Sequence, residues 1–301
     1  MSFPSFLSSI NQQECDEFAI RSQQLWGKAN EAGVFDLEWA YGREDEAGVT
    51  LGDELERIGY KGEADVSGRP FHAFLEVHIE QGPYLEEDGI DIGVVTLANG
   101  QTWYEITVEG FESHAGPTPM TRRRDALLGA AGIIEKVNAI GMAHQPGGCA
   151  TVGMIEATPN SRNVIPGKVF LTVDFRHPEP AELAAMAAEL EAAVPDICAG
   201  RKVMASLEKI FDFAPLHFDA RCVAAVRGAA EKLGYSHKDM TSGAGHDAVH
   251  MGMVGPAAMI FTPCVDGISH NEAEDMTKEW AEAGGSVLLH AALELAEVVG
   301  N

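Results

Sequence analysis

The sequence predicts an α/β protein whose open, mixed or parallel sheet is interrupted by an inserted α+β domain. Residues 257–261 form a fully apolar run, which is typical of a strand buried on both faces of a parallel sheet. From Ile92 onward the chain changes to short strands of alternating polarity, and its 32 glycines are typical of many tight turns. We therefore expect a body formed by residues 1–96 and 212–301, and an inserted domain formed by residues 97–211.

In the first part of the body, short helices precede a single strand. The patterns predict helices at residues 14–27, 36–41 and 50–58, a strand at 72–78, and a turn or short helix opening at 79–86. Thr50 stands three residues before Asp53 and resembles a capping box, and Gly59 is expected to end that helix.

The inserted domain is predicted to be a small sheet with helices on one face. Asn99-Gly100 between two strand patterns indicates a hairpin, and in the second strand Tyr104, Ile106 and Val108 alternate with polar residues. One face of that strand is therefore expected to be buried. The expected elements are strands at residues 92–96, 102–109, 149–156, 169–176 and 202–210, and helices at 124–140 and 181–194.

After Pro215 the pattern returns to that of a larger α/β body. Residues 220–233 form a helix pattern closed by Gly234. We also expect helices at residues 246–252 and 277–299, on either side of the apolar strand at 257–261.

The charge of the chain excludes some classes of function. Lys plus Arg number 21 and Asp plus Glu number 46, which gives a net charge of −25, so a phosphate backbone would be repelled and a general nucleic-acid binder is not expected. The apolar runs are far shorter than the ~20 residues of a helical membrane span, and no basic n-region of a secretory signal opens the sequence. Five scattered cysteines indicate reduced thiols in a cytoplasmic protein.

Three histidines stand at the ends of predicted elements in the body. His78 ends a buried strand, His246 follows flexible glycines at a helix start, and His270 follows a strand and a turn. An isolated Val-His-Ile is typical of a core histidine that bonds a carbonyl group, but three such histidines favour a polar site at the strand ends. Zinc prefers imidazole nitrogen and carboxylate oxygen, so His78 and His270 are reasonable metal ligands.

The inserted domain carries a polar cluster of its own. His114 precedes three arginines at a helix start, Asn163 lies in a polar turn, and Arg176 ends an apolar strand. A guanidinium group binds a carboxylate bidentately, so this cluster suits the recognition of a carboxylate or an amide. Arg122 and Arg123 are equally consistent with an ordinary solvated surface.

Seven short motifs of this sequence resemble motifs that occur in the same order in one known family. That family is the hydantoinase/carbamoylase branch of the M20 metallopeptidase-like amidohydrolases, which includes N-carbamoyl-L-amino-acid hydrolases, allantoate amidohydrolases and β-ureidopropionases. The resemblance covers roughly residues 32–300. It rests on residues 76–83 (EVHIEQGP), 113–120 (SHAGPTPM), 123–126 (RRDA), 163–166 (NVIP), 174–177 (DFRH), 242–248 (SGAGHDA) and 267–270 (GISH).

The resemblance implies a zinc or manganese enzyme that hydrolyses the C–N bond of an N-carbamoyl amino acid or a related ureido acid such as allantoate. It implies that the inserted domain acts as a lid and forms a homodimer, and that the partners are small molecules rather than nucleic acid or membrane. By the same resemblance, His78 and His270 match metal ligands, and His114 matches a catalytic histidine presented across the dimer to stabilise oxyanion charge. The positions that match substrate-binding residues are Gln81, Asn163, Arg176 and His246.

The sequence departs from the family pattern ahead of His78. Family members carry about a hundred further N-terminal residues with a His-x-Asp element, a bridging Asp and a Glu-Glu pair, whose first Glu activates metal-bound water. The closest echo of that pair is Asp16-Glu17, whose neighbours do not match. We therefore expect an incomplete N-terminal part of the body and weakened hydrolysis.

Four interpretations remain open from the sequence. The first is an amidohydrolase whose sequence lacks its start. The second is a catalytically impaired paralogue that is kept for dimerisation or regulation, and the third is a ureido-acid binding protein without turnover. A peptidase of the wider family is disfavoured, because the motifs at residues 76–83 and 242–248 resemble the ureido-hydrolysing branch.

Overall fold

The computed structural model describes residues 37–45, 47–62 and 71–296, which form two compact units. One unit comprises the described residues up to Leu97 and from His217 onward, and the other comprises residues 98–216. The boundaries expected from the sequence fall after residues 96 and 211. The helix predicted at residues 14–27 and the Asp16-Glu17 pair lie outside the described residues.

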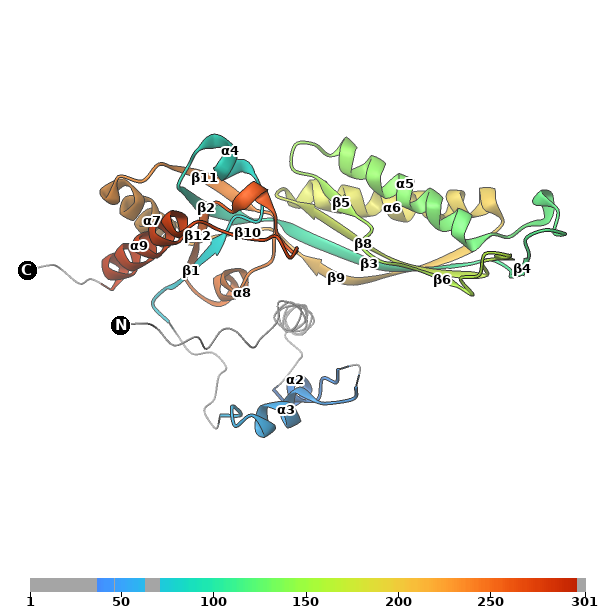
Figure 1. The fold of residues 1–301 in the computed structure, drawn as a ribbon, viewed down its shortest axis with the longest axis horizontal. Helices are drawn as coiled ribbons and strands as arrows, with labels where there is room; N and C mark the ends of the chain where they lie inside the picture. The colour runs from blue at the N-terminus through green and yellow to red at the C-terminus, as the bar shows by residue number, and fades with distance from the viewer. Residues whose placement is uncertain (1–36, 46, 63–70, 297–301) are drawn as a thin grey trace, which may run out of the picture. The chain divides into compact units, whose positions relative to one another are not determined.

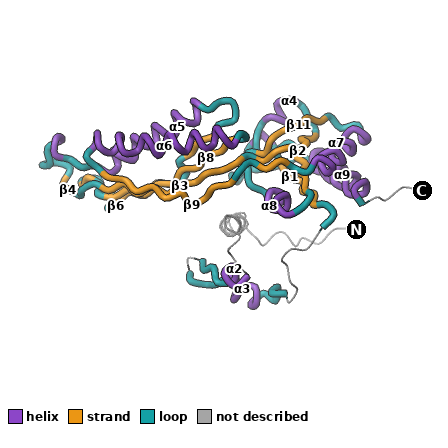
Figure 2. Tube along the Cα trace, turned by 180° about the vertical axis from the view of Figure 1, so that it is seen from behind, coloured by secondary structure: helices purple, strands orange, loops and turns teal. Residues whose placement is uncertain are grey.

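The first unit contains a mixed five-stranded sheet (Figures 1 and 2). β1 (Phe74–Ile79) pairs in parallel with β12 (Ala257–Thr262), which pairs antiparallel with β2 (Ile92–Ala98). β10 (Leu216–His217) and β11 (His237–Ser242) both pair with β2. Every residue of β12 is buried, as the apolar run predicts, and the open mixed sheet confirms the predicted α/β class.

Two helices of this unit begin or end at caps that the sequence predicts. The elements are α2 (Leu37–Tyr41), α3 (Leu51–Arg57), α4 (Tyr84–Asp88), α7 (Ala220–Leu233), α8 (Asp247–Val254), the short 3-10 turn η2 (Val265–Gly267) and α9 (Lys278–Leu295). The Thr50 hydroxyl accepts from the Asp53 amide, which confirms the predicted start of α3. Gly234 ends α7 in the left-handed conformation that favours glycine, as expected.

The second unit is an antiparallel sheet covered on one face by two helices. Its strands lie in the order β5 (Cys149–Thr151), β8 (Lys168–His177), β3 (Gly100–Glu109) and β9 (Met204–Phe213), with β6 (Ile155–Thr158) also on β8. β4 (Ser113–His114) pairs with β7 (Val164–Ile165), and the helical segments are η1 (Met120–Arg122), α5 (Ala126–Ala143) and α6 (Pro180–Arg201).

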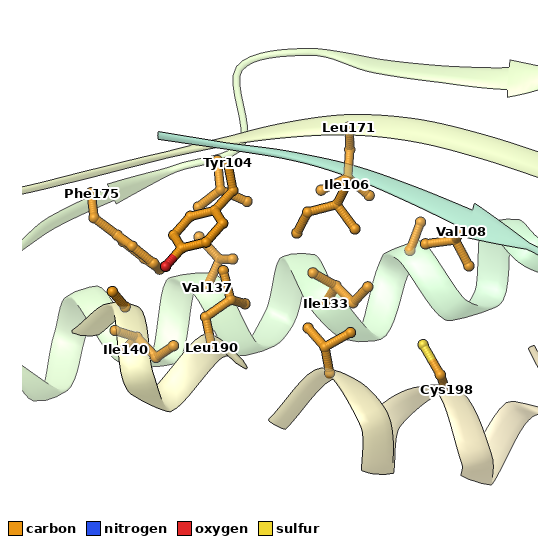
Figure 3. Packing of buried hydrophobic residues seen from close by; sticks show 14 of the residues in the cluster. Tyr104, Ile106, Val108, Ile133, Val137, Ile140, Leu171, Phe175, Leu190 and Cys198 are labelled. Carbon is orange, nitrogen blue, oxygen red and sulfur yellow. The ribbon is translucent and has the colours of Figure 1, made fainter. Parts of the chain in front are cut away.

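The core of this unit lies between the sheet and the two helices (Figure 3). Tyr104, Ile106 and Val108 of β3 face Ile133 of α5 and Leu190 of α6, as the alternation along β3 predicts. By length and composition α5 qualifies as a membrane span, but 44% of it is buried against this core. α5 therefore packs as a core helix of the unit.

The predicted hairpin at Asn99-Gly100 is wrong. β2 pairs within the sheet of the first unit and β3 within the sheet of the second, so Asn99 joins two sheets. The type I′ turn that Asn-Gly favours in a two-residue hairpin needs positive φ at both residues. Neither Asn99 nor Gly100 has a positive φ. Glycine is required at position 100 for another reason: a Cβ atom there would lie 2.7–2.8 Å from Pro215, Leu183 and Phe213.

Two further expectations need correction. The strand expected at residues 149–156 is two strands, β5 and β6, which both pair with β8. β11 was not predicted as a strand because its sequence, HKDMTS, is largely polar; it pairs only at the periphery of the sheet, on β2.

Replacing Ile133 by Ala is expected to lower the free energy of unfolding by about 2–5 kcal/mol, because it opens a cavity in a fully buried core. The same substitution at Ile155, which is 46% exposed, is the matched control and should change stability far less. Urea denaturation followed by circular dichroism measures both. Equal losses for the two variants would contradict the packing described here.

Candidate functional site

His78 lies at the carboxyl end of β1, next to the last residue of the strand. Its Nδ1 atom is 2.8 Å from the carbonyl oxygen of Ile79, so Nδ1 carries the proton and donates it. A hydrogen bond of this kind, to a backbone carbonyl oxygen, is typical of a histidine in a protein core. It also fixes the tautomer that leaves the Nε2 lone pair available, which is the usual arrangement of a metal-binding histidine.

Two more side chains meet His78 at this point. The His246 ring lies edge-on to the His78 ring, with centroids 4.7 Å apart, and His246 Nδ1 is 3.8 Å from a carboxylate oxygen of Glu76. His246 Nε2 also lies 2.9 Å from the hydroxyl of Ser242. Glu76 and His78 stand two apart on β1, so their side chains leave the same face of the strand.

Burial raises the pKa of Glu76, and this effect exceeds the lowering by the backbone N–H of Ala248 and by nearby His78. The Ala248 amide, in the first turn of α8, donates to the carboxylate at 2.6 Å. A half-buried carboxylate beside two imidazole rings favours a bound cation, because a cation offsets the lost hydration of the charged form.

Glu76, His78 and His246 together are a donor set that fits a divalent metal. Each offers one ligand atom, and these atoms all lie within 4.8 Å of one another. One carboxylate oxygen and two imidazole nitrogens suit zinc, and manganese accepts the same donor types. The sequence interpretation missed Glu76 as a member of this group, although its spacing from His78 on one strand carried the signal.

His270 does not belong to this cluster of three. It follows η2 in a left-handed backbone conformation (φ 55°), its side chain is exposed, and its backbone N–H donates to Glu274. Its loop is nevertheless tied to the end of β1, because the side-chain amide of Gln81 donates to the hydroxyl of Ser269 at 3.0 Å. The carboxyl ends of the parallel strands β1 and β12 thus hold Gln81 and His270 in neighbouring loops.

The side chain of Gln81 leaves one polar atom unsatisfied among the described residues. Its Oε1 atom is buried and, within the described part of the chain, accepts no hydrogen bond. A buried carbonyl oxygen without a donor is costly, so a ligand or water that donates a hydrogen bond fits there.

Glu80, two residues after His78, does not join this group. Its two carboxylate oxygens accept the backbone N–H groups of Tyr84 and Leu85 at the start of α4. The carboxylate is therefore a helix cap rather than part of the metal-binding group.

In the second unit, His114 and Asn163 lie side by side. His114 on β4 pairs with Val164 on β7, and the carbonyl oxygen of Asn163 accepts the Ala115 amide at 2.9 Å. Both side chains are exposed; His114 Nδ1 accepts the Gly116 amide, and Asn163 Oδ1 accepts the Ser161 hydroxyl. The pairing of two short strands thus brings together two residues that lie 49 positions apart in the sequence.

Arg176 lies on β8 with its guanidinium already engaged. Its Nε and Nη2 atoms contact the Asp174 carboxylate at 2.6–3.1 Å, and both side chains are 27% exposed. The sequence analysis predicts that this guanidinium binds a carboxylate of the substrate. In the structure such a carboxylate would have to share it with Asp174.

Comparison with known sequences identifies relatives over most of the chain. The sequence profile of Peptidase family M20/M25/M40 matches residues 37–294. An N-carbamoyl-L-amino-acid amidohydrolase of Rhizobium meliloti is 52% identical over 268 residues, which are 89% of this chain and 64% of that protein. An allantoate amidohydrolase of Bacillus subtilis (strain 168) is 35% identical over 285 residues, 94% of this chain and 69% of the relative.

Solved structures give the same result. A hydantoinase/carbamoylase family amidase from Burkholderia vietnamiensis is 58% identical, with a TM-score of 0.84 over 90% of this chain and 66% of that one. The chain thus spans slightly less than two thirds of this amidase and of the Rhizobium meliloti relative. Since the family profile matches most of the sequence, the chain belongs to peptidase family M20/M25/M40, and its structural neighbours are amidases of the hydantoinase/carbamoylase family.

Proposed function

We propose that this chain belongs to a metal-dependent amidohydrolase that hydrolyses the C–N bond of N-carbamoyl amino acids or of related ureido acids such as allantoate. The observation that carries the proposal is His78, whose tautomer is fixed by the Ile79 carbonyl group beside Glu76 and His246. The names of the relatives support the substrate class, because they are N-carbamoyl-L-amino-acid and allantoate amidohydrolases.

The metal site is proposed at the end of β1. His78 would hold Zn²⁺ or Mn²⁺ through Nε2, and His246 and Glu76 lie within reach of the same ion. His270, in the adjoining loop, remains a predicted ligand. When bound, the metal supplies Lewis-acid polarisation and lowers the pKa of a coordinated water.

The other predicted residues are proposed to bind and orient the substrate. The unsatisfied Oε1 atom of Gln81 would accept an N–H of a ureido group, and the guanidinium of Arg176 would bind a carboxylate. His246 and Asn163 complete the predicted binding residues. His114 is predicted to donate a hydrogen bond to the oxyanion that develops during hydrolysis.

A second interpretation is a ureido-acid binding or regulatory protein without turnover. It is favoured by the position of His270, a predicted metal ligand that lies outside the cluster of Glu76, His78 and His246. Binding of an N-carbamoyl amino acid without release of product, measured in the presence of zinc or manganese, would establish this second interpretation.

Replacing His78 by Ala is expected to weaken zinc or manganese binding by at least ~100-fold, because a direct ligand matters more than an outer-shell partner, whose loss costs ~10–100-fold. The exposed His217 replaced by Ala is the matched control and should bind metal as the parent does. Elemental analysis after dialysis and calorimetric titration measure the effect. Full metal content in the His78 variant would refute the site.

Replacing Arg176 by Ala is expected to weaken binding of an N-carbamoyl amino acid by about 2–4 kcal/mol, since the substrate carboxylate would be left unpaired. Asp174→Asn breaks the same ion pair but leaves the guanidinium, so it should keep or strengthen binding. Calorimetry on both variants decides between a binding role and a purely structural pair. Equal losses of affinity would assign Arg176 to the structural pair alone.

We also propose that the protein is cytoplasmic and forms a symmetric homodimer through the second unit. α5 leaves Leu127, Leu128 and Met142 exposed, which a helix at an interface would cover. Light scattering at micromolar concentration should give twice the 32.2 kDa mass of one chain, and Leu128→Glu should shift it toward the monomer. A mass of one chain for the parent protein would contradict the dimer.

A further inference from the structure

The side chain of His114 has one of its two ring nitrogens occupied. β4 and the loop that follows it lie at one end of the second unit (Figure 1). The backbone N–H of Gly116 donates to His114 Nδ1 at 3.0 Å, so in the neutral ring Nδ1 is the acceptor and Nε2 carries the proton. The residue is exposed, and within the described part of the chain no acceptor meets this Nε2–H group. His114 therefore presents one defined hydrogen-bond donor to its surroundings.

A hydrogen bond between residues two apart in an exposed loop lasts only as long as the loop keeps its shape. Two backbone contacts support this loop. The Ala115 amide donates to the carbonyl oxygen of Asn163 at 2.9 Å, and the Thr118 amide donates to that of His114 at 3.3 Å. These contacts leave the carbonyl groups of Ala115 and Thr118, on either side of Gly116 in the sequence, for other donors.

The guanidinium of Arg123 binds both of these carbonyl groups. Its Nη2 atom donates to the carbonyl oxygen of Ala115 at 2.6 Å, and its Nε atom donates to that of Thr118 at 3.2 Å. One planar and rigid group thus holds both ends of the short segment that carries the Gly116 amide. Hydrogen bonds from a charged donor are roughly twice as strong as neutral ones, so each of them contributes more than a backbone bond of the same loop.

The backbone around Arg123 is itself fixed by the core elements of the second unit. The carbonyl oxygen of Arg124 accepts the amide of Phe111, just after β3, at 2.8 Å. A Cβ atom on Gly110 would lie 2.1 Å from that oxygen, so the end of β3 directly contacts the segment before α5. Asp125 then caps the start of α5 with its carboxylate. The guanidinium therefore extends from a rigid base into an exposed loop.

We propose that Arg123 is a positioning residue for His114. It holds residues 115–118 in the shape that keeps the Gly116 amide on Nδ1, and it thereby keeps Nε2–H as the donor that His114 presents. The inference rests on the proposed function for one step, in which this donor meets the oxyanion that develops during hydrolysis; a donor that is already in place stabilises that charge best. From the sequence, Arg122 and Arg123 are equally consistent with a solvated surface. The structure separates them, because Arg122 is exposed whereas Arg123 binds two carbonyl groups.

Nitrogen-15 NMR of the protein tests the proposal without substrate or metal. In the parent protein we expect a coupling across the hydrogen bond between the Gly116 amide and His114 Nδ1, and a ring protonated at Nε2. Arg123→Ala should abolish the coupling, allow both ring tautomers and raise the rate of exchange of the Gly116 amide with solvent at least ~10-fold. Arg123→Lys can still donate to one carbonyl group and should restore part of the protection. Arg122→Ala is the matched control and should leave all of these measurements unchanged.

The amide of Ile106 is the internal reference, because β3 pairs with β8 on one side and with β9 on the other. It should stay protected in every variant. The proposal is overturned if the parent shows no coupling between the Gly116 amide and Nδ1, or if Arg123→Ala behaves like Arg122→Ala. Loss of protection at Ile106 in Arg123→Ala would also overturn it, because Arg123 would then support the whole unit rather than the loop. If the measurements are as expected but the chain binds no N-carbamoyl amino acid, the positioning role stands and the proposed function fails.

Discussion

The parallel pairing of β1 with β12 is the interaction on which the site in the first unit depends. Parallel strands end at the same edge of a sheet, so this one register places the loops that follow Ile79 and Thr262 side by side. Residues almost two hundred positions apart, such as Gln81 and Ser269, then come within hydrogen-bonding distance. The helix start at His246 reaches the same edge from a third segment.

The sequence predicted the elements better than it predicted their partners. Alternation along β3 and the apolar run of β12 identified which residues are buried, because burial leaves a periodic trace in one segment. The hairpin prediction at Asn99-Gly100 is wrong because the same dipeptide occurs both in tight turns and where two parts of the chain approach closely. Only the tertiary contacts of Gly100 with Leu183 and Pro215 distinguish the two cases.

For the candidate site, the sequence identified the histidines but not the group that they form. It paired His78 with His270, whereas the structure clusters His78 with His246 and Glu76. The sequence also does not show that Glu80 accepts the amides at the start of α4 or that Asp174 contacts Arg176, because local geometry decides these contacts. Which polar group a side chain meets depends on backbone direction, which residue type alone does not encode.

The Glu76 carboxylate makes two contacts, one with each of its oxygens. One oxygen faces His246, while the other holds the amide of Ala248 at the first turn of α8. The helix and the cluster of imidazoles therefore share a single anchor. Truncation of Glu76 to Ala therefore perturbs both the position of α8 and the electrostatics of the cluster. Glu76→Gln keeps an acceptor for the Ala248 amide but removes the charge, so it separates the two contributions.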